Sequence, residues 1–163
     1  CSDLSYSKKA AVTAARLGKL IAKSKNILVY GAEKDVNSLP TIAASEARKS
    51  GGLTIGITYE KGLGLYLEKA ATAVVATGLV RGGGRETTLI LSCDAVIALS
   101  GGSGTLNEIC VAYQANIPVV IIKGFGGWSD KLANSYLDER KRYKIISVKD
   151  EESALEEALK TIK

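Results

Sequence analysis

The chain has 163 residues, of which 46% are hydrophobic and 24% charged, a balance that is typical of one globular domain and excludes a mainly disordered chain. It holds no histidine and only three cysteines, which excludes a histidine-based triad, a zinc site and a disulfide scaffold and predicts that no metal is bound. Its 22 basic and 17 acidic residues give a net charge of +5, which suits an anionic ligand but serves solubility equally well. Because the sequence shows no long apolar stretch and no secretory leader, we expect a cytoplasmic protein that does not enter a membrane.

Helical and strand patterns alternate along the chain. The apolar spacing predicts helices over residues 7–24, 40–49, 85–92, 105–115, 128–136 and 150–162, and strands over residues 27–30, 53–57, 73–76, 95–99, 119–122 and 144–148. Such alternation is typical of βαβ units, so we expect residues 1–163 to form a single Rossmann-like nucleotide-binding domain, an α/β three-layer sandwich with a doubly wound parallel sheet. Since doubly wound domains usually open on a strand and this chain opens on a helix, we expect a first strand upstream of Cys1.

The strongest functional signal is a glycine-rich turn between an expected strand and an expected helix. It consists of Gly101, Gly102, Ser103, Gly104 and Thr105. Glycines let the backbone approach a ligand closely, and the free amides and partial positive charge at a helix N-terminus attract anions. The sequence therefore predicts that these five residues bind a phosphate group. The turn matches neither the Walker pattern nor GxGxxG, and a turn without a ligand is the alternative.

Two charged residues complete the predicted site. Glu108 follows Thr105 by three residues, which is the spacing of a structural capping box as well as that of a functional carboxylate beside a phosphate. Arg85 comes directly after a run of glycines that indicates a close backbone approach to a ligand, namely Gly82, Gly83 and Gly84. At this position Arg85 would bridge a ligand phosphate, pair with Glu108, or be a plain surface charge.

These motifs resemble the Lonely Guy superfamily, many members of which were once labelled lysine decarboxylases. Its hallmark is Pro-Gly-Gly-x-Gly-Thr-x-x-Glu with an Arg upstream of a Ser-Asp-Ala element, matched here by Arg85, residues 94–99 and residues 101–108. Further landmarks are similar to the branch that holds the molybdenum-cofactor carrier proteins and many uncharacterised relatives: Thr77-Gly78-Leu79, Pro118-Val119 and Gly126-Gly127-Trp128. The likeness covers about residues 26–160 and is specific from 77 to 128.

The resemblance implies a small phosphorylated ligand and a homodimer or higher homo-oligomer. In the enzyme branch the N-glycosidic bond of a nucleoside 5′-monophosphate is hydrolysed to free base and ribose 5-phosphate, and Arg85 and Glu108 match the catalytic pair of that branch. Glycoside cleavage passes through an oxocarbenium-like state that a carboxylate stabilises. The loop after the first strand shapes the pocket in relatives, which adds Gly31 to the predicted pocket residues.

The sequence departs from the family pattern at three places. Ser100 replaces the proline of the hallmark, and Glu86 follows Arg85 where the enzyme branch has Lys and the carrier branch usually Asn. After Gly31 the run Ala32 to Asn37 replaces the expected glycines and Met, and its Glu33 and Asp35 would repel a second phosphate if they faced the pocket. The phosphate half of the site is intact, whereas the half that would hold a base is altered.

Three functions stay open. The preferred one is a carrier-like protein that binds an AMP-like nucleotide or the molybdenum cofactor, because it needs only the anion turn and a cleft. The second is the phosphoribohydrolase, for which both Arg85 and Glu108 are present. The third is a nucleic-acid binding module that uses the basic run 140–144, and it is the least favoured because only Tyr136 and Tyr143 lie there as stacking platforms. For the homodimer contact, the candidate exposed aromatic residues are Tyr59, Tyr66 and Phe125.

Overall fold

The computed structural model describes residues 6–33, 37–61, 70–160 and 162. Contacts within the chain form two compact units. The N-terminal unit spans Ala11–Leu89, and the C-terminal unit combines Cys1–Ala10 with Ile90–Lys163. Each unit contains a three-stranded parallel sheet with helices packed against it, which confirms the predicted α/β class.

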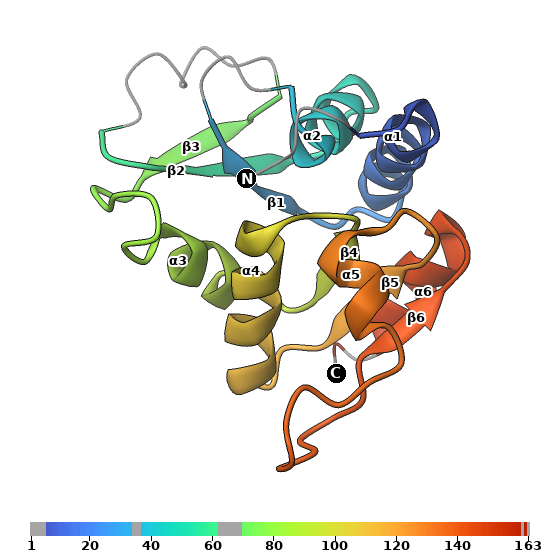
Figure 1. Ribbon diagram of the computed structural model, residues 1–163. Coiled ribbons are helices and arrows are strands. Elements are labelled where there is room, and N and C mark those ends of the chain that lie inside the picture. The colour runs from blue at the N-terminus through green and yellow to red at the C-terminus, as the bar shows by residue number, and fades with distance from the viewer. Residues whose placement is uncertain (1–5, 34–36, 62–69, 161, 163) are drawn as a thin grey trace. The chain divides into compact units, whose positions relative to one another are not determined.

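The sheet of the N-terminal unit has the strand order β1-β2-β3, and all its strands are parallel (Figure 1). The strands are β1 (Leu28–Ala32), β2 (Thr54–Thr58) and β3 (Ala73–Ala76). Ala32 lies opposite Thr58, and Thr58 lies opposite Ala76. The three strands therefore end in line, and the residues that follow them meet at the carboxyl edge of the sheet, where open parallel sheets bind ligands.

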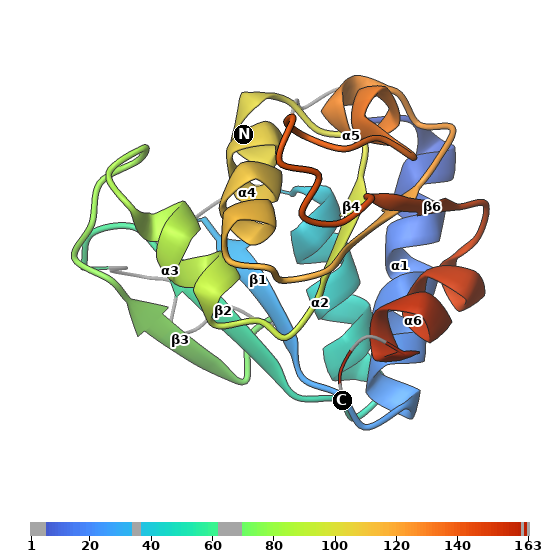
Figure 2. The ribbon, with the colours of Figure 1, turned by 90° about the horizontal axis from the view of Figure 1, so that it is seen from below.

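The helices of this unit are α1 (Lys8–Lys23) from Ala11 onward, α2 (Leu39–Lys49) and α3 (Arg85–Leu91) up to Leu89. Helix α2 packs on β1 and β2, and Figure 2 shows it alongside β1. Its N-terminus is capped by Ser38, whose hydroxyl accepts a hydrogen bond of 3.3 Å from the Thr41 amide. Gly18 lets α1 approach α2 closely, because a Cβ added there would lie 1.9 Å from the carbonyl oxygen of Ala43.

The C-terminal unit has the strand order β4-β5-β6, again parallel. Its elements are β4 (Val96–Leu99), α4 (Ser103–Gln114), β5 (Val119–Ile122), α5 (Gly127–Leu132), β6 (Ile146–Val148) and α6 (Glu151–Lys160). All four residues of β5 are buried, as expected for the central strand of a parallel sheet with helices on its faces. Helix α6 packs on all three strands, and α4 packs on β4 and β5.

Some element boundaries differ from the prediction, for local reasons. Strand β1 continues through Gly31 to Ala32 instead of ending at Tyr30. Helix α5 ends at Leu132, well before residue 136, because Ala133 is extended and Asn134 has a φ of 59°. The last strand begins at Ile146, since the amide of Ile145 donates to the carbonyl of Ser135.

Candidate functional site

The glycine-rich turn follows β4 and leads into α4. The helix begins at Ser103, so that Gly102 is its N-cap and no side chain hydrogen-bonds to that cap. The first turn of α4 contains no acidic residue. A helix N-terminus that is capped by glycine leaves its first amides to water or a ligand, and its partial positive charge favours an anion.

Helix α5 holds this turn from the other side. The Trp128 amide donates to the carbonyl of Gly101 at 2.9 Å, and the buried Ser129 hydroxyl donates to the carbonyl of Ser100. A Cβ added to Gly127 would lie 2.5 Å from the carbonyl oxygen of Gly101. The carbonyls of the turn are thus satisfied within the protein, which fixes the turn from which α4 starts.

The capping box, which the spacing of Thr105 and Glu108 left open as the structural alternative, is not formed. Thr105 lies inside α4, two residues after its first residue, and does not cap the helix. Its side chain packs against the turn instead, because a Cβ added to Gly101 would lie 2.1 Å from Thr105 Oγ1. Glycine at this position, with a φ of 103°, therefore serves both the backbone conformation and the approach of the Thr105 hydroxyl.

Ser100 explains one departure from the family pattern. Its φ is 56°, in the left-handed region, whereas a proline ring holds φ near about −65°. The turn in this conformation is therefore closed to the proline of the family hallmark.

Glu108 lies on the half-buried side of α4, in the C-terminal unit. Burial, with added repulsion from the charges of Asp94 and Glu108, raises the pKa of the Cys93 thiol to about 11. A thiol with so high a pKa is protonated at neutral pH and is a poor nucleophile. Cys93 and Cys110 are both half-buried.

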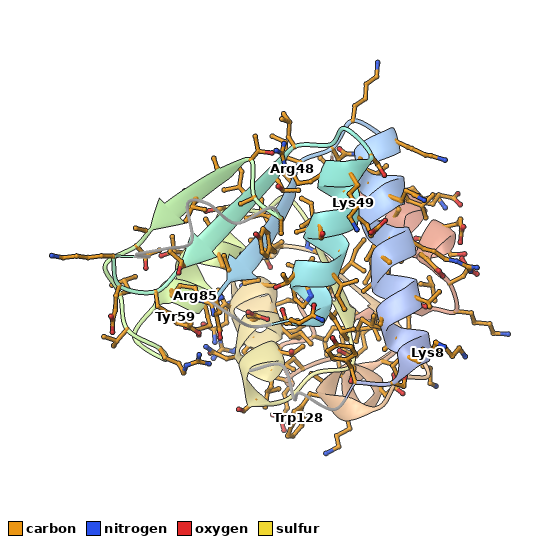
Figure 3. The ribbon with its side chains drawn as sticks, turned by 90° about the horizontal axis from the view of Figure 1, so that it is seen from above. Lys8, Arg48, Lys49, Tyr59, Arg85 and Trp128 are labelled. Atoms are coloured by element: carbon orange, nitrogen blue, oxygen red, sulfur yellow. The ribbon has the colours of Figure 1, made fainter. Side chains whose placement is uncertain are left out.

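The second predicted group lies in the N-terminal unit, at the carboxyl edge of its sheet. Glu33 follows β1 and Tyr59 follows β2 directly, while Arg81 and Arg85 come after β3. The in-line strand ends place Glu33 and Tyr59 side by side, and the turn before α3 brings both arginines to them. Figure 3 shows Tyr59 and Arg85 next to each other.

Arg85 is the buried centre of this group. Its side chain is only 4% exposed, and its Nη2 donates to Glu33 Oε1 at 3.1 Å. The Tyr59 ring stacks on the guanidinium, with 4.0 Å between Cζ and the ring centroid. A Cβ added to Gly31 would lie 2.1 Å from Arg85 Nη1. Gly31 therefore makes room for Arg85, so the structure brings these two predicted site residues together.

Glu86 lies beside Arg85 and is 5% exposed. Its Oε1 accepts a hydrogen bond of 2.5 Å from the Tyr59 hydroxyl and lies 4.0 Å from Arg85 Nη2. Burial opposes the charged form of Glu86, but the Tyr59 hydroxyl, its own backbone amide and Arg85 outweigh burial and hold the pKa of the carboxyl below its ordinary value. Conversely, burial and the bond to Glu86 raise the pKa of Tyr59 to about 12.

Two polar atoms of this group are buried without a hydrogen-bond partner among the described residues, Arg85 Nε and Glu86 Oε2. Native proteins leave few such atoms, and they concentrate where a ligand or water binds.

The three glycines before α3 position the two arginines of this group. Gly82 and Gly84 have φ values of 71° and 114°, which turn the chain between Arg81 and Arg85.

Sequence reasoning missed part of this group. Glu33 was expected to repel a second phosphate if it faced the pocket, but it binds both arginines. Tyr59, a candidate exposed aromatic residue for the dimer contact, is half-buried and lies against both guanidiniums. The signal that could have found them is their position, each directly after a parallel strand. Phe125, the third expected aromatic contact, is half-buried with Lys9 Nζ 5.4 Å from its ring centroid. Tyr66 and Asp35 lie outside the described residues.

The basic run 140–144 is partly tied into the C-terminal unit. The Tyr143 hydroxyl donates to the carbonyl of Ile117 at 2.6 Å, and its ring packs on Tyr113 with 4.8 Å between centroids. The Arg142 amide donates to the Tyr113 hydroxyl. Tyr143 is thus an anchoring residue of this segment, and a base could not stack on it as it could on an exposed ring.

The described part of the chain contains neither a membrane-spanning helix nor a metal-binding cluster. No helix there combines the length and the apolar character that crossing a bilayer requires. No cluster of three or more Cys, Asp or Glu side chains in the same residues is arranged to hold a metal ion.

Comparison with known proteins gives consistent results. The chain is similar to the X-ray structure of TM1055, with a TM-score of 0.83 and 25% identity over 93% of this chain and 88% of that one. It is similar to the molybdenum cofactor carrier protein of Chlamydomonas reinhardtii, with a TM-score of 0.78 and 25% identity over 96% of this chain and 89% of that one. The molybdenum cofactor binding protein of Rippkaea orientalis gives a TM-score of 0.78 and 25% identity over 97% and 91%.

A sequence relative and a family profile complete the comparison. An uncharacterized protein of Archaeoglobus fulgidus is 30% identical over 108 residues, which are 66% of this chain and 67% of that protein. The solved structures confirm the Rossmann-like fold and the resemblance to the carrier branch of the Lonely Guy-like proteins. The profile of the SLOG cluster4 family matches residues 3–155. The chain belongs to the SLOG cluster4 family.

Proposed function

We propose that this protein is a carrier-like binder of a phosphate-bearing nucleotide or pterin cofactor, and that the phosphate binds at the N-terminus of α4. The observation that carries the proposal is the N-terminus itself, which has a glycine N-cap, no capping side chain and no acidic residue in its first turn. Such a terminus binds phosphate through backbone amides and the helix dipole. The predicted phosphate residues, from Gly101 to Thr105, all belong to this turn.

Molybdenum cofactor is one candidate ligand, because two structures similar to this chain are described as its carrier or binding protein. The donor set of the turn suits the phosphate end of that cofactor as well as that of AMP, since backbone amides recognise the phosphate and not the group attached to it. The geometry therefore supports a phosphate-bearing ligand more directly than it supports one ligand by name. We expect the protein to meet this ligand in the cytoplasm, which cell fractionation would test.

A carrier agrees better with the structure than a phosphoribohydrolase does. Hydrolysis would require Arg85 and Glu108 to act together on the substrate, whereas binding requires the turn alone. The Arg85 guanidinium is buried, stacked on Tyr59 and paired with Glu33. The proposed catalytic roles of Arg85 and Glu108 stay predictions.

The experiment is a thermal-shift screen against AMP, other nucleoside monophosphates, a pterin phosphate and inorganic phosphate. A ligand at 100 times its dissociation constant should stabilise the folded protein by about 2.7 kcal/mol. The screen is repeated with Ser103→Asp, which adds a carboxylate to the exposed first position of α4. This carboxylate should stabilise the helix by about 0.3–1 kcal/mol, while repelling a bound phosphate.

Opposite effects on stability and binding distinguish ligand loss from unfolding. We expect Ser103→Asp to melt at or above the wild-type temperature and to bind every phosphate ligand at least tenfold more weakly. Asn107→Asp is the matched control, because it adds the same charge to an exposed position beyond the first turn. No thermal shift with any phosphate ligand would contradict the proposal. Free adenine released from AMP, and lost in Glu108→Gln, would establish the hydrolase instead.

A further inference from the structure

We propose that Arg81 and Arg85 form a second oxyanion site, in the N-terminal unit, and that the chain keeps this site filled with its own Glu33 carboxylate. The site has the shape and charge to bind a carboxylate or phosphate group of a ligand. Because Glu33 occupies it, such a group does not bind. The inference goes beyond the proposed function, because it concerns different residues in the other unit.

The first argument is geometric. One carboxylate bridges two guanidiniums, with Glu33 Oε1 at 3.1 Å from Arg85 Nη2 and Glu33 Oε2 at 2.9 Å from Arg81 Nη2. Two arginines that converge on the two oxygens of one anion make the arrangement by which proteins bind carboxylates and phosphates. Glu33 therefore stands where the oxyanion of a ligand would stand.

The second argument is that the site is built and rigid. Both guanidiniums lie against the Tyr59 ring, with Cζ-to-centroid distances of 4.0 Å for Arg85 and 4.9 Å for Arg81. Gly31 leaves room for Arg85, and Glu86 holds the hydroxyl of Tyr59. Arg85 is nine-tenths buried, and its Nε has no hydrogen-bond partner among the described residues. The arginine is thus positioned before any ligand arrives.

The third argument is electrostatic. Two arginines face Glu33 and Glu86, so the group is neutral as it stands. Removing the Glu33 charge would leave an excess positive charge on a buried guanidinium, which is costly unless an anion replaces it. Glu33 is 20% exposed and Arg81 is 54% exposed, so a small anion from solvent can reach the position that Glu33 occupies.

The consequence is a specificity rule. A ligand that presented an anionic group to Arg81 and Arg85 would have to displace Glu33, which already makes both charge-assisted hydrogen bonds. A ligand that presents a neutral group to Arg81 and Arg85 does not have to displace Glu33, so its affinity is not reduced. In this chain Glu33 thus acts as a selectivity residue against ligands with a second anionic group, by occupying the site more than by repelling the ligand.

Chemical rescue tests the proposal. Glu33→Ala removes the carboxylate and opens its space. We expect this variant to melt several degrees below the wild type, and 100 mM acetate or phosphate to restore at least half of the loss. Sodium chloride at matched ionic strength should restore much less. In calorimetric titration, the variant should bind one more phosphate per chain than the wild type, at least tenfold more tightly than any second wild-type site.

Three further variants make the test specific. Arg81→Ala in the Glu33→Ala background should abolish the rescue. Glu46→Ala removes a glutamate from an exposed pair with Lys49 and should show no anion dependence. Ser103→Asp, added to Glu33→Ala, should leave the rescue by acetate unchanged, so failure at α4 and failure here are separate results.

Two outcomes would overturn the proposal. One is a Glu33→Ala protein whose melting temperature responds equally to acetate, phosphate and chloride; the other is a rescue that survives loss of Arg81. If Glu33→Ala fails to fold in any buffer, Glu33→Gln replaces it, since the amide keeps the shape and removes the charge. Phosphate must then raise the melting temperature of Glu33→Gln more than that of the wild type, and equal shifts would refute the inference.

Discussion

Ser100 adopts a left-handed backbone conformation, which is uncommon for serine. Its φ of 56° costs a non-glycine residue roughly 1–2 kcal/mol, and a proline cannot adopt it. We expect Ser100→Gly to be neutral or stabilising by up to about 1 kcal/mol, and Ser100→Pro to destabilise by about 3 kcal/mol or more. Urea denaturation of the two variants measures both effects. A Ser100→Pro protein as stable as the wild type would mean that the turn adopts another conformation.

The hydroxyl group of Tyr59 is the part of this side chain that hydrogen-bonds to Glu86. In Tyr59→Phe the ring still stacks on Arg85, but Glu86 Oε1 loses its 2.5 Å hydrogen bond. Glu86 Oε2 already has no partner among the described residues. Leaving a buried acceptor unsatisfied costs about 1–3 kcal/mol, and we expect that loss in denaturant unfolding at pH 7. Tyr136→Phe, at an exposed ring, is the control and should change the stability by less than about 0.5 kcal/mol.

The same hydroxyl gives stability a pH dependence of known sign. The pKa of Tyr59 rises from 10.0 to about 12 on folding. Between these values the unfolded chain releases the Tyr59 proton, which the folded chain keeps. The stabilisation that this hydroxyl contributes is therefore complete below pH 10 and is lost as the pH rises toward 12. The free energy of unfolding should fall more steeply with pH in the wild type than in Tyr59→Phe across this window. Parallel curves would show that Tyr59 ionises as readily in the folded protein as in the unfolded chain.

At the scale of single residues, the sequence indicated which residues belong to the site but not which of them contact one another. Arg85 could be singled out, because three glycines and a family motif mark it. The partner of Arg85 could not, since Glu33 lies 52 residues away in the chain. A charge on a loop repels or attracts according to what faces it, and only the in-line ends of β1 and β2 decide that. For this reason Glu33 was expected to repel a second phosphate if it faced the pocket, while the structure has it bound to two arginines.

Among the elements, the close crossing of α1 and α2 depends on one glycine. Alanine in place of a helical glycine usually adds about 1 kcal/mol of stability. At Gly18 we expect the reverse, because the new methyl group would lie 1.9 Å from the Ala43 carbonyl oxygen and 2.9 Å from its Cα. Backbone atoms cannot rotate away, so Gly18→Ala should destabilise the protein by about 1–3 kcal/mol, the usual cost of overpacking.

The measurement is the midpoint of urea unfolding, with Lys19→Ala as the control. Lys19 is the next residue of α1 and is exposed, so the same final residue is introduced without a clash. A Gly18→Ala protein that is as stable as the wild type would show that α1 and α2 separate at little cost.

Elements were easier to predict than their ends. The uninterrupted apolar run of β5 identifies a buried strand, and all four of its residues are indeed buried. The apolar spacing placed the start of α4 at Thr105, yet the helix begins at Ser103 behind a glycine. The choice between these starts depends on contacts from α5, chiefly the Trp128 amide on Gly101. Such contacts across the chain leave no local pattern in the sequence.

For the whole molecule, the order of elements carried most of the information. Strands followed by helices imply parallel sheets with right-handed crossovers, and solved structures at 25% identity match 93% or more of this chain with that fold. What the order does not convey is which side chains remain exposed. Val75 in β3 and Val80 after it are 44% and 58% exposed, although their apolar character favours burial.

These exposed valines are the basis of the last prediction, that the protein is a homodimer. Among the described strands of this unit, β3 lies at an edge of the sheet, and an exposed apolar edge strand is a surface that proteins cover with another chain or protect with charge. Light scattering should give about twice the 17.1 kDa of one chain. Val75→Lys should shift the protein toward the monomer, since a lysine at an edge strand opposes pairing. Val12→Lys, at a valine of α1 that is 45% exposed, should leave the mass unchanged. A wild-type mass of one chain at micromolar concentration would refute the dimer, and equal effects of both variants would place the contact elsewhere than at β3.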